Sequence, residues 1–336
     1  MSAQVKRIAY RRALKGRRDD LSRTDFGPKV LVVISGGGIG NAVEATPLVQ
    51  GVRALWPKAV MTVVVPHGDL FENWCVPDHI TDSQEDVRGA SFDHSFFPYP
   101  FLSAISPWRQ VCDLGVVHHP RVWLRQYFLK PERQYFMDML KPLGGKGIMP
   151  PLYVSLKEPQ RHLPEASMRV CIAPGGKNEL RWRHKRWLLY GSLAGMIRQT
   201  YPHAQICIIG TEEDDFPAEQ RDDPHIVDLR GKLTLAETAW ILKKASLAVG
   251  NDCGPMHIAC AVQTPAITIF GPTCAIKNAP WNKGVALITP AECGPCQYDA
   301  RLETCSDPRC LNEITPQMVM AKMTEILKQT EIVGQV

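Results

Sequence analysis

Asp252 and His257 are the residues whose types and spacing best suit chemistry in this chain. A short apolar run ends at Asp252, and Gly254 and Pro255 follow, a pattern typical of a strand that turns directly into a helix. The unpaired N–H groups and positive dipole of a helix start favour an anion such as phosphate, and His257 can donate to the same anion. In the alternative reading this is an ordinary crossover in which the aspartate only caps the helix.

A basic loop follows an earlier apolar run and contains Lys177, Arg181, Arg183, His184, Lys185 and Arg186. Charge of this density is usually a solvated face. Here it coincides with glycines, with the carboxyl end of an expected strand and with the start of the next helix. The loop therefore favours a diphosphate site.

A glycine-rich turn, SGGGIGN, covers residues 35–41 and invites a dinucleotide interpretation. Two requirements fail: the third glycine of the motif would fall on Asn41, and the next strand ends at His67 with no acid for a ribose hydroxyl. A dehydrogenase is therefore disfavoured. What remains is a turn that lets a ligand approach the backbone, with Asn41 and Glu44 on one side of the helix that follows. Glu44 has either a catalytic role or only complements the helix dipole.

Continuous apolar runs alternating with helical patterns predict an α/β protein with parallel sheets. The expected strands are Val30–Ile34, Met61–Val65, Val170–Ala173, Gln205–Gly210, His225–Gly231, Leu247–Asp252, Ala266–Gly271 and Val285–Thr289. Pro47 should kink or break the first helix, and the pattern over 69–146 is too weak to assign strands. The two halves echo each other, which predicts two Rossmann-like domains facing across a cleft.

Four segments follow from these patterns. They are a basic tail (1–26), an N-terminal Rossmann-like domain (27–155), a C-terminal Rossmann-like domain (165–315) that includes a cysteine-rich loop (293–310), and a terminal helix (316–330). The polar stretch 157–167 is the expected linker. The terminal helix has one apolar face available for packing.

Composition excludes several classes of protein. The 336 residues are 45% apolar and 22% charged, and no apolar run approaches the ~20 residues that span a bilayer. No secretory signal pattern is visible, which predicts a cytoplasmic protein. The net charge of +5 comes from residues 1–23, which alone carry +6. That tail either contacts anionic lipid at the inner membrane face or is a solvated terminus, and no aromatic-interleaved basic patch indicates a nucleic-acid partner.

Four of the eleven cysteines are clustered: Cys293, Cys296, Cys305 and Cys310 form C-x2-C-x8-C-x4-C. This spacing is compatible with tetrahedral zinc or iron. Reduced thiols without a metal are the alternative. The other seven are scattered and do not form a secreted disulfide framework.

Four motifs resemble glycosyltransferase family 9, typified by the ADP-heptose:lipopolysaccharide heptosyltransferases with the GT-B fold. They are GIGNAVEATPLVQGVRALWP (38–57), APGG (173–176) followed by KRW (185–187), the long segment LRGKLTLAETAWILKKASLAVGNDCGPMHIACAV (229–262), and IFGPT (269–273). The segment around Asp252 is the most specific of them. The resemblance extends from Val30 to about Leu327. It implies that the terminal helix packs back toward the first domain, as in GT-B enzymes.

The resemblance implies a role for each matching residue. The donor-binding aspartate falls on Asp252, the backbone N–H groups on Cys253 and Gly254, the end of the phosphate cradle on His257 and the phosphate-binding lysine on Lys185. Gly176 and Glu212 match contacts to the phosphate and the nucleoside. The family needs no metal for transfer, because the helix start and Lys185 stabilise the leaving diphosphate.

The chain departs from the family at one place, where Gly-Asp is replaced by Gly40 and Asn41. In the family this aspartate is taken as the general base, and an amide cannot accept the proton. Glu44, about one turn along the same helix, is the candidate replacement, with Asn41 orienting the acceptor.

The resemblance implies an inverting glycosyltransferase. Its first domain would bind the acceptor, a bacterial surface glycan or lipopolysaccharide-type glycolipid. Its second domain would bind the nucleotide-sugar donor, for which ADP-heptose is the expected compound. Two alternatives remain open. The cysteine cluster favours a protein acceptor, and the departure at Asn41 favours a non-catalytic sugar-nucleotide-binding protein.

Overall fold

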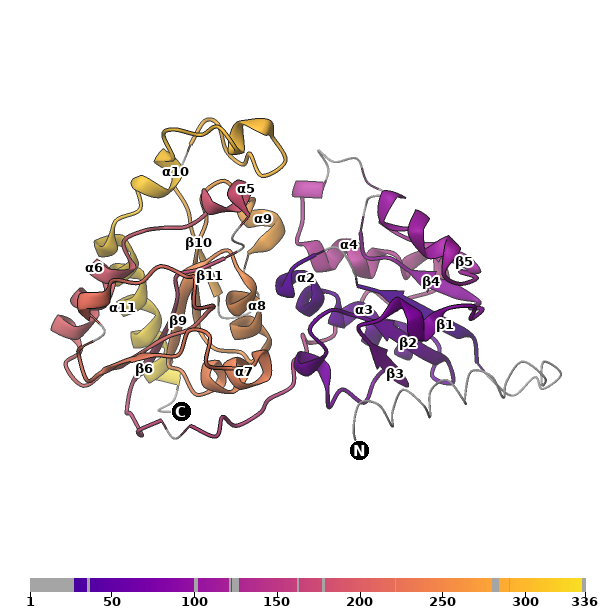
Figure 1. The fold of residues 1–336 in the computed structure, drawn as a ribbon, viewed down its shortest axis with the longest axis horizontal. Coiled ribbons are helices and arrows are strands. Elements are labelled where there is room, and N and C mark those ends of the chain that lie inside the picture. The colour runs from indigo at the N-terminus through magenta and orange to yellow at the C-terminus, as the bar shows by residue number, and fades with distance from the viewer. Residues whose placement is uncertain are drawn as a thin grey trace. The chain divides into compact units, whose positions relative to one another are not determined.

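The computed structural model of the protein describes residues 27–34, 37–99, 102–120, 122, 127–161, 163–176, 179–220, 222–279, 284–289 and 291–333. The chain divides into two compact units, residues 1–153 and 154–336 (Figure 1). The basic tail predicted over 1–26 lies outside the described residues. Within those ranges, no helix has both the length and the apolar character to cross a membrane.

Unit 1 contains a five-stranded parallel sheet in the order β3-β2-β1-β4-β5. Its strands are β1 (Lys29–Val33), β2 (Val60–Val64), β3 (His79–Thr81), β4 (His94–Phe96) and β5 (Val116–His118). The runs KVLVV and VMTVV form the two central strands, because β-branched apolar side chains suit a strand that is buried on both faces. The strand order reverses between β1 and β4.

The helices of unit 1 are α2 (Ile39–Glu44), α3 (Thr46–Leu55) and α4 (Glu132–Asp138). The predicted break occurs where α2 ends and α3 begins, and Pro47 occupies the first turn of α3, where its missing N–H costs nothing. Short 3-10 helices cover Gly68–Phe71, Gln84–Val87, Leu102–Ala104, Ser106–Gln110 and Lys141–Leu143.

Unit 2 contains a six-stranded parallel sheet in the order β11-β10-β9-β6-β7-β8. Its strands are β6 (Arg169–Ala173), β7 (Gln205–Ile208), β8 (Ile226–Asp228), β9 (Leu247–Asn251), β10 (Ala266–Ile269) and β11 (Gly284–Leu287). This is the order of a doubly wound Rossmann sheet, with its reversal between β6 and β9. The predicted α/β class with parallel sheets is confirmed in both units.

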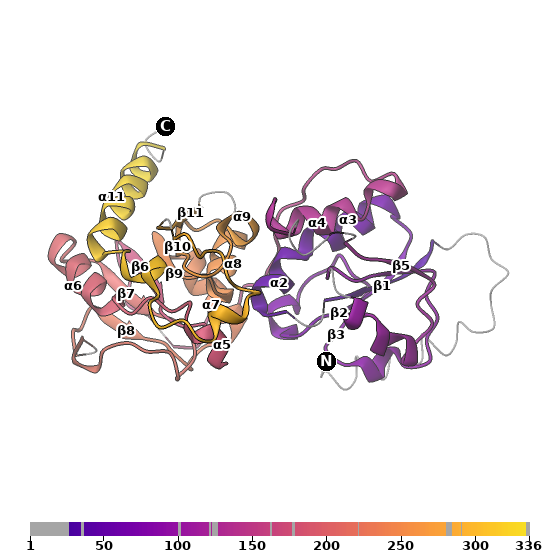
Figure 2. The same cartoon turned by 90° about the horizontal axis from the view of Figure 1, so that it is seen from above.

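The helices of unit 2 are α5 (Leu180–Arg183), α6 (Tyr190–Thr200), α7 (Leu235–Lys243), α8 (Gly254–Ala261), α9 (Ala275–Asn278), α10 (Arg309–Asn312) and α11 (Pro316–Val333). Residues 218–220 and 300–302 form 3-10 turns. Helices α6 and α11 pack together, and α7 packs on α8 (Figure 2). The core of unit 2 includes Val319, Met320, Met323 and Ile326 of α11. This helix therefore buries side chains in the core of unit 2, and its packing toward the first domain stays a prediction.

Candidate donor site

The candidate site lies at the carboxyl edge of the unit 2 sheet, where the strand order reverses. Open α/β sheets bind ligands at such a switch point. Strand β6 leads into residues 174–176, and β9 leads through Asp252 into α8. The APGG and GNDCGP motifs, 77 residues apart in the chain, are brought together because β6 and β9 are hydrogen-bonded neighbours with Ala173 opposite Gly250.

Asn251 ties these two strand ends together. The side chain is fully buried, and its Nδ2 donates to the carbonyls of Pro174 (2.6 Å) and Gly175 (3.1 Å). Its Oδ1 accepts from the backbone N–H of Trp187 (2.9 Å) and the hydroxyl of Tyr190 (3.0 Å). One amide therefore holds the end of β9, the loop after β6 and the segment that carries Lys185.

Asp252 is the centre of a polar cluster. Its carboxylate accepts from Asn278 Nδ2 at 2.9 Å and lies 3.8 Å from His257 Nε2. Its backbone carbonyl accepts from Lys185 Nζ at 2.5 Å. Lys277, which is almost fully buried, donates to Asn278 Oδ1 at 3.1 Å, which fixes the amide of Asn278 with its NH₂ toward the carboxylate.

Burial by itself would raise the pKa of Asp252. The charges of Lys185 and His257 and the hydrogen bond from Asn278 outweigh it and hold that pKa well below its usual range. Asp252 is therefore an anion at any working pH. The neighbouring Cys253 behaves oppositely, because burial raises the pKa of its thiol to about 12. Cys253 is a neutral thiol and not a nucleophile.

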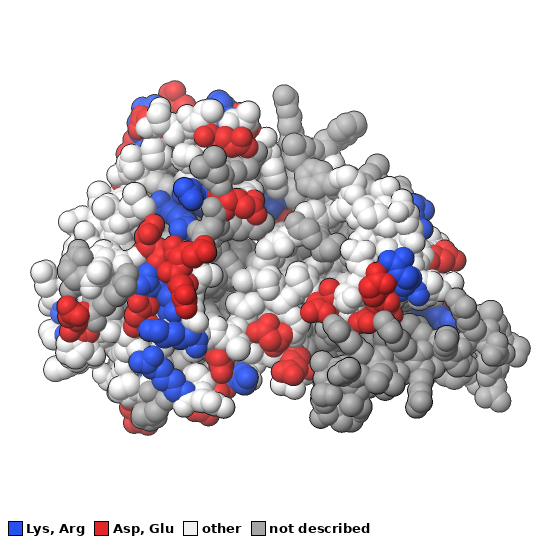
Figure 3. All heavy atoms as spheres, viewed as in Figure 1, with Lys and Arg blue, Asp and Glu red and all other residues white. Residues whose placement is uncertain are grey.

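Helix α8 begins directly after Asp252 and Cys253, so its N-terminus lies beside the polar cluster around Asp252. Among the described residues no side chain caps this helix at Cys253, and Pro255 in the first turn has no N–H to satisfy. The first-turn N–H groups and the helix dipole therefore favour an anion beside Lys185 and His257. On the face of unit 2 seen in Figure 3, basic and acidic side chains are interspersed. Because the two signs of charge are mixed on this face, individual side chains such as Lys185 must balance the charge of a bound ligand.

The buried side chain of Asp214 packs against the glycine turns next to this cluster. A Cβ on Gly175 would lie 1.9 Å from Asp214 Cγ, and one on Gly210 would lie 2.3 Å from Asp214 Oδ2, so the buried carboxyl fills the space that both glycines leave. Arg186 Nη2 bridges this carboxyl (3.3 Å) and the carbonyl of Gly176 (2.8 Å). Gly175 and Gly210 therefore make room for the side chain of Asp214.

The predicted donor residues are therefore distributed as follows. Lys185, Asp252, Cys253, Gly254 and His257 surround the start of α8, and a Cβ on Gly176 would lie 3.4 Å from Lys185 Cε. Glu212 is on the exposed loop after β7 and packs over Gly231.

The sequence reasoning gave no role to Asn251, Asn278 or Asp214. Their partners are distant in sequence, and only the polar residue ending an apolar strand, Asn251, offered a signal.

Unit 1 places Asn41 beside a carboxylate that the sequence reasoning missed. Asn41 Nδ2 donates to Glu132 Oε2 at 2.7 Å, and the hydroxyl of Tyr127 donates to Glu132 Oε1 at 2.6 Å. Glu44 is 2% exposed and accepts from Arg133 Nη1 at 2.9 Å in a buried ion pair. Asn41 and Glu44 share helix α2, as predicted, but their partners are different residues of α4.

The four clustered cysteines are half-buried or exposed. Burial, with a smaller contribution from the other three thiols, raises the pKa of Cys310 to about 11. Within the part of the chain that the structure describes, no group of three or more His, Cys, Asp or Glu side chains is arranged to hold a metal ion.

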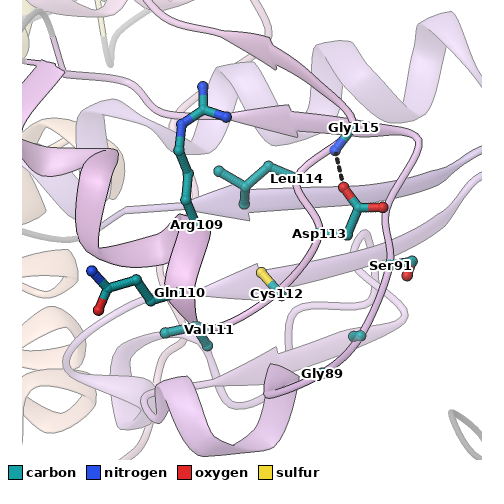
Figure 4. Close-up of a pocket in the computed structure, with 10 residues that line it drawn as sticks. Gly89, Ser91, Arg109, Gln110, Val111, Cys112, Asp113, Leu114 and Gly115 are labelled. Carbon is teal, nitrogen blue, oxygen red and sulfur yellow. Dashed lines mark hydrogen bonds between the residues drawn. The ribbon is translucent and has the colours of Figure 1, made fainter.

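The described residues form a hollow in each unit. A hollow of about 460 Å³ in unit 1 is lined by residues 89–91 and 109–115 (Figure 4). These residues precede β4 and β5, so it lies at the amino edge of the sheet, opposite the edge where α/β sheets bind ligands. A hollow of about 270 Å³ in unit 2 is lined in part by Pro174, Arg186, Tyr190 and Phe216, at the carboxyl edge next to the Asp252 cluster.

The fold and site define an α/β protein of two Rossmann-like units with a candidate anion site in the second. Residues 133–306, just over half of the chain, match the family model "Glycosyltransferase family 9 (heptosyltransferase)". The chain belongs to this family.

Individual relatives agree with this assignment. The lipooligosaccharide heptosyltransferase 2 of Haemophilus influenzae is 30% identical over 157 residues, which are 44% of this chain and 43% of that protein. The aligned stretch therefore spans less than half the length of this curated relative. The structure of E. coli ADP-heptose lps heptosyltransferase II superposes with a TM-score of 0.66 at 16% identity, covering 90% of this chain and 99% of that one.

The iron-containing dodecameric glycosyltransferase TibC from enterotoxigenic E. coli superposes with a TM-score of 0.63 at 14% identity, covering 91% and 77% of the two chains. At these identities the superpositions establish the fold. The expected GT-B class of two Rossmann-like domains is confirmed by these solved structures together with the two parallel sheets.

Proposed function

We propose that the protein is an inverting glycosyltransferase that moves a heptose from ADP-heptose onto the sugar core of a bacterial lipopolysaccharide-type acceptor. Unit 2 binds the donor and unit 1 the acceptor. The observation that carries the proposal is the cluster of Lys185, Asp252 and His257 at the open start of α8. Such a cluster suits a diphosphate, and the chain belongs to a family of sugar transferases.

In this proposal the donor diphosphate lies against the first turn of α8. Lys185 and His257 supply positive charge as the sugar–oxygen bond breaks and negative charge gathers on the leaving diphosphate. Asp252 stays anionic and holds Lys185 and His257 in place, with Asn278 and Lys277 behind it. Cys253 and Gly254 contribute backbone N–H groups, and Gly176 and Glu212 line the phosphate and nucleoside ends. Glu44 stays a predicted base, although its ion pair with Arg133 disfavours that role.

The choice of donor and acceptor rests on the names of similar proteins, among them an ADP-heptose lps heptosyltransferase II and a lipooligosaccharide heptosyltransferase 2. The proposed location is the cytoplasm, with the basic segment 1–23 contacting anionic lipid at the inner membrane face.

The test compares wild type with Lys185→Met and Lys185→Arg. ADP binding is measured by calorimetry, and ADP release from ADP-heptose with and without heptose-deficient lipopolysaccharide. One charge-assisted hydrogen bond contributes about 1.5–3 kcal/mol, so Lys185→Met should weaken ADP binding roughly 10- to 150-fold. Lys185→Arg keeps the charge and should lose less. A wild-type protein that binds ADP but never turns over would support the sugar-nucleotide-binding alternative. One that binds no ADP would refute the donor site itself.

A structural zinc or iron held by Cys293, Cys296, Cys305 and Cys310 is a second part of the proposal, supported by their spacing in the sequence. Such an ion would cross-link the loop that follows β11. Elemental analysis of the purified protein should find about one metal per chain, and the Cys296→Ser variant should lose it. If the wild-type protein contains far less than one metal ion per chain, the proposed metal site is wrong.

A further inference from the structure

Lys185 is the residue proposed above to meet the charge of the donor diphosphate, and the following inference rests on that proposed function. A lysine carries its charge on a flexible four-carbon stem, so an ammonium that moves freely loses rotamer entropy when it binds an anion. A lysine that the fold already holds in position binds the anion more tightly, because little of that entropy is left to lose. Contacts that fix the ammonium of Lys185 therefore strengthen the donor site.

Two contacts with the strand ends hold the Lys185 side chain. Its Nζ donates to the backbone carbonyl of Asp252 at 2.5 Å, which ties the ammonium to the turn between β9 and α8. Its stem runs close to Gly176, where a Cβ would lie 3.4 Å from Lys185 Cε. The side chain of Lys185 therefore joins the loop after β6 to the start of α8.

The indole ring of Trp182 is a third contact. Lys185 Nζ lies over this ring, 5.5 Å from its centroid, within the distance of about 6 Å at which a cation is attracted to the face of an aromatic ring. Trp182 belongs to the short helix α5, and its carbonyl accepts from the backbone N–H of Lys185 at 3.3 Å. Side chains three residues apart in a helical turn lie on the same face, so this turn brings the ring to the ammonium.

The ring and the carbonyl can hold the ammonium without using it up. An ammonium group has three N–H donors, and the carbonyl of Asp252 accepts from one of them. A ring face attracts the positive charge as a whole, which leaves donors for an anion. Trp182 and Lys185 are both half-buried, and partial exclusion of water strengthens the attraction between a cation and a ring.

We propose that Trp182 is a positioning residue of the donor site, whose ring holds the ammonium of Lys185 beside the start of α8. A fixed ammonium need not reorganise as negative charge gathers on the leaving diphosphate. Trp182 therefore acts on the ligand through Lys185. The sequence reasoning singled out the charged residues of this loop and gave no role to the tryptophan among them.

The first experiment replaces the ring by an apolar side chain that has no π face. In Trp182→Leu the Kd for ADP, measured by calorimetry, should rise roughly 5- to 30-fold, the range between an exposed and a desolvated cation–π contact. Trp182→Phe keeps a ring face and should regain part of this loss. Trp240→Leu is the matched control, because Lys244 Nζ also lies 5.5 Å from the Trp240 ring, at the end of α7 that leads into the amino end of β9. Its Kd should stay within twofold of wild type.

The second experiment asks whether the ring acts through the ammonium. Trp182→Leu is combined with Lys185→Met, and the Kd of the double variant should match that of Lys185→Met alone within twofold. The reason is that the ring has no cation left to hold once the lysine is gone. A tryptophan that only supported the fold of the loop would weaken ADP binding by the same factor in both backgrounds.

The third experiment keeps the shape of the ring and changes only its electrons. Tryptophan analogues with one, two and three ring fluorines, incorporated at position 182 alone, withdraw electron density from the π face in steps. The Kd for ADP should rise with each added fluorine, because the attraction of the ammonium to the ring weakens. This measurement decides the question even if Trp182→Leu does not fold, as judged by circular dichroism.

The outcomes separate this inference from the proposed function. A Kd in folded Trp182→Leu within twofold of wild type, an equal further loss in the Lys185→Met background, or a Kd that does not change with fluorination would overturn the role of Trp182 alone. A wild-type protein that binds no ADP would overturn the donor site, and with it both proposals.

Discussion

Replacing Asn251 by alanine tests whether one buried amide organises the donor site. The wild-type side chain makes four hydrogen bonds, to Pro174, Gly175, Trp187 and Tyr190. Each contributes a net of about 1 kcal/mol in a typical protein, and a buried group left without a partner costs about 1–3 kcal/mol. Since all four partners lie around a fully buried position, the substitution should destabilise this part of unit 2 by about 4 kcal/mol.

The two units can unfold separately, so a single unfolding curve is ambiguous. Native-state hydrogen exchange resolves the region, because the backbone N–H of Trp187 bonds directly to Asn251. A loss of about 4 kcal/mol should speed exchange in peptides covering residues 186–190 by roughly three orders of magnitude. ADP affinity should fall as well, because Lys185 loses its fixed place beside Asp252.

Asn251→Asp is the discriminating control, because it has almost the same volume. The aspartate keeps the acceptor for Trp187 and Tyr190 but turns the two donated bonds into repulsion between oxygens. If the hydrogen bonds matter, it should be at least as damaging as alanine. Exchange in residues 186–190 that accelerates less than tenfold in Asn251→Ala, or an Asp variant close to wild type, would refute this reasoning.

Two further predictions concern buried charges. Glu44→Gln should destabilise unit 1 by about 3–5 kcal/mol, because it removes one charge of a buried ion pair and leaves the buried guanidinium of Arg133 without the charge of Glu44. Chemical denaturation should show most of that loss regained in the Glu44→Gln, Arg133→Met double variant, and a fully additive double variant would contradict the ion-pair argument. The lowered pKa of Asp252 contributes stability that is complete above the unfolded-state value of about 3.9 and is lost as pH falls toward the lower native value. Wild type should therefore lose stability below about pH 4 more steeply than Asp252→Asn, as measured by melting temperature against pH, and parallel curves would argue against it.

Most of the sheet could be predicted from the sequence because its central strands are buried on both faces. Strands such as β1, β2, β6 and β9 are continuous apolar runs, and only their ends differ from prediction by one or two residues. Strands β3, β4 and β5 were not assigned, because each has only three residues and includes a half-buried histidine, and β3 and β5 are the edge strands. A run that short carries no periodicity.

The candidate site was predictable only where its residues adjoin a strand or a helix start. Lys185, Asp252 and His257 met that condition, and the structure brings them together. Asn278 and Glu132 did not, because their contacts span 26 residues to Asp252 and 91 residues to Asn41. Those contacts are a property of the tertiary fold, which the local sequence does not encode.

The packing of Asp214 against two glycines bears on how this protein can diverge. Gly175 and Gly210 belong to different turns, and each is confined to glycine by the same carboxyl group. A larger residue in either turn requires a smaller one at 214, and that change also removes the partner of Arg186. Substitutions at positions 175, 186, 210 and 214 should therefore occur together, both in evolution and in protein engineering. A change in one of the two turns should be accompanied by a change in the other.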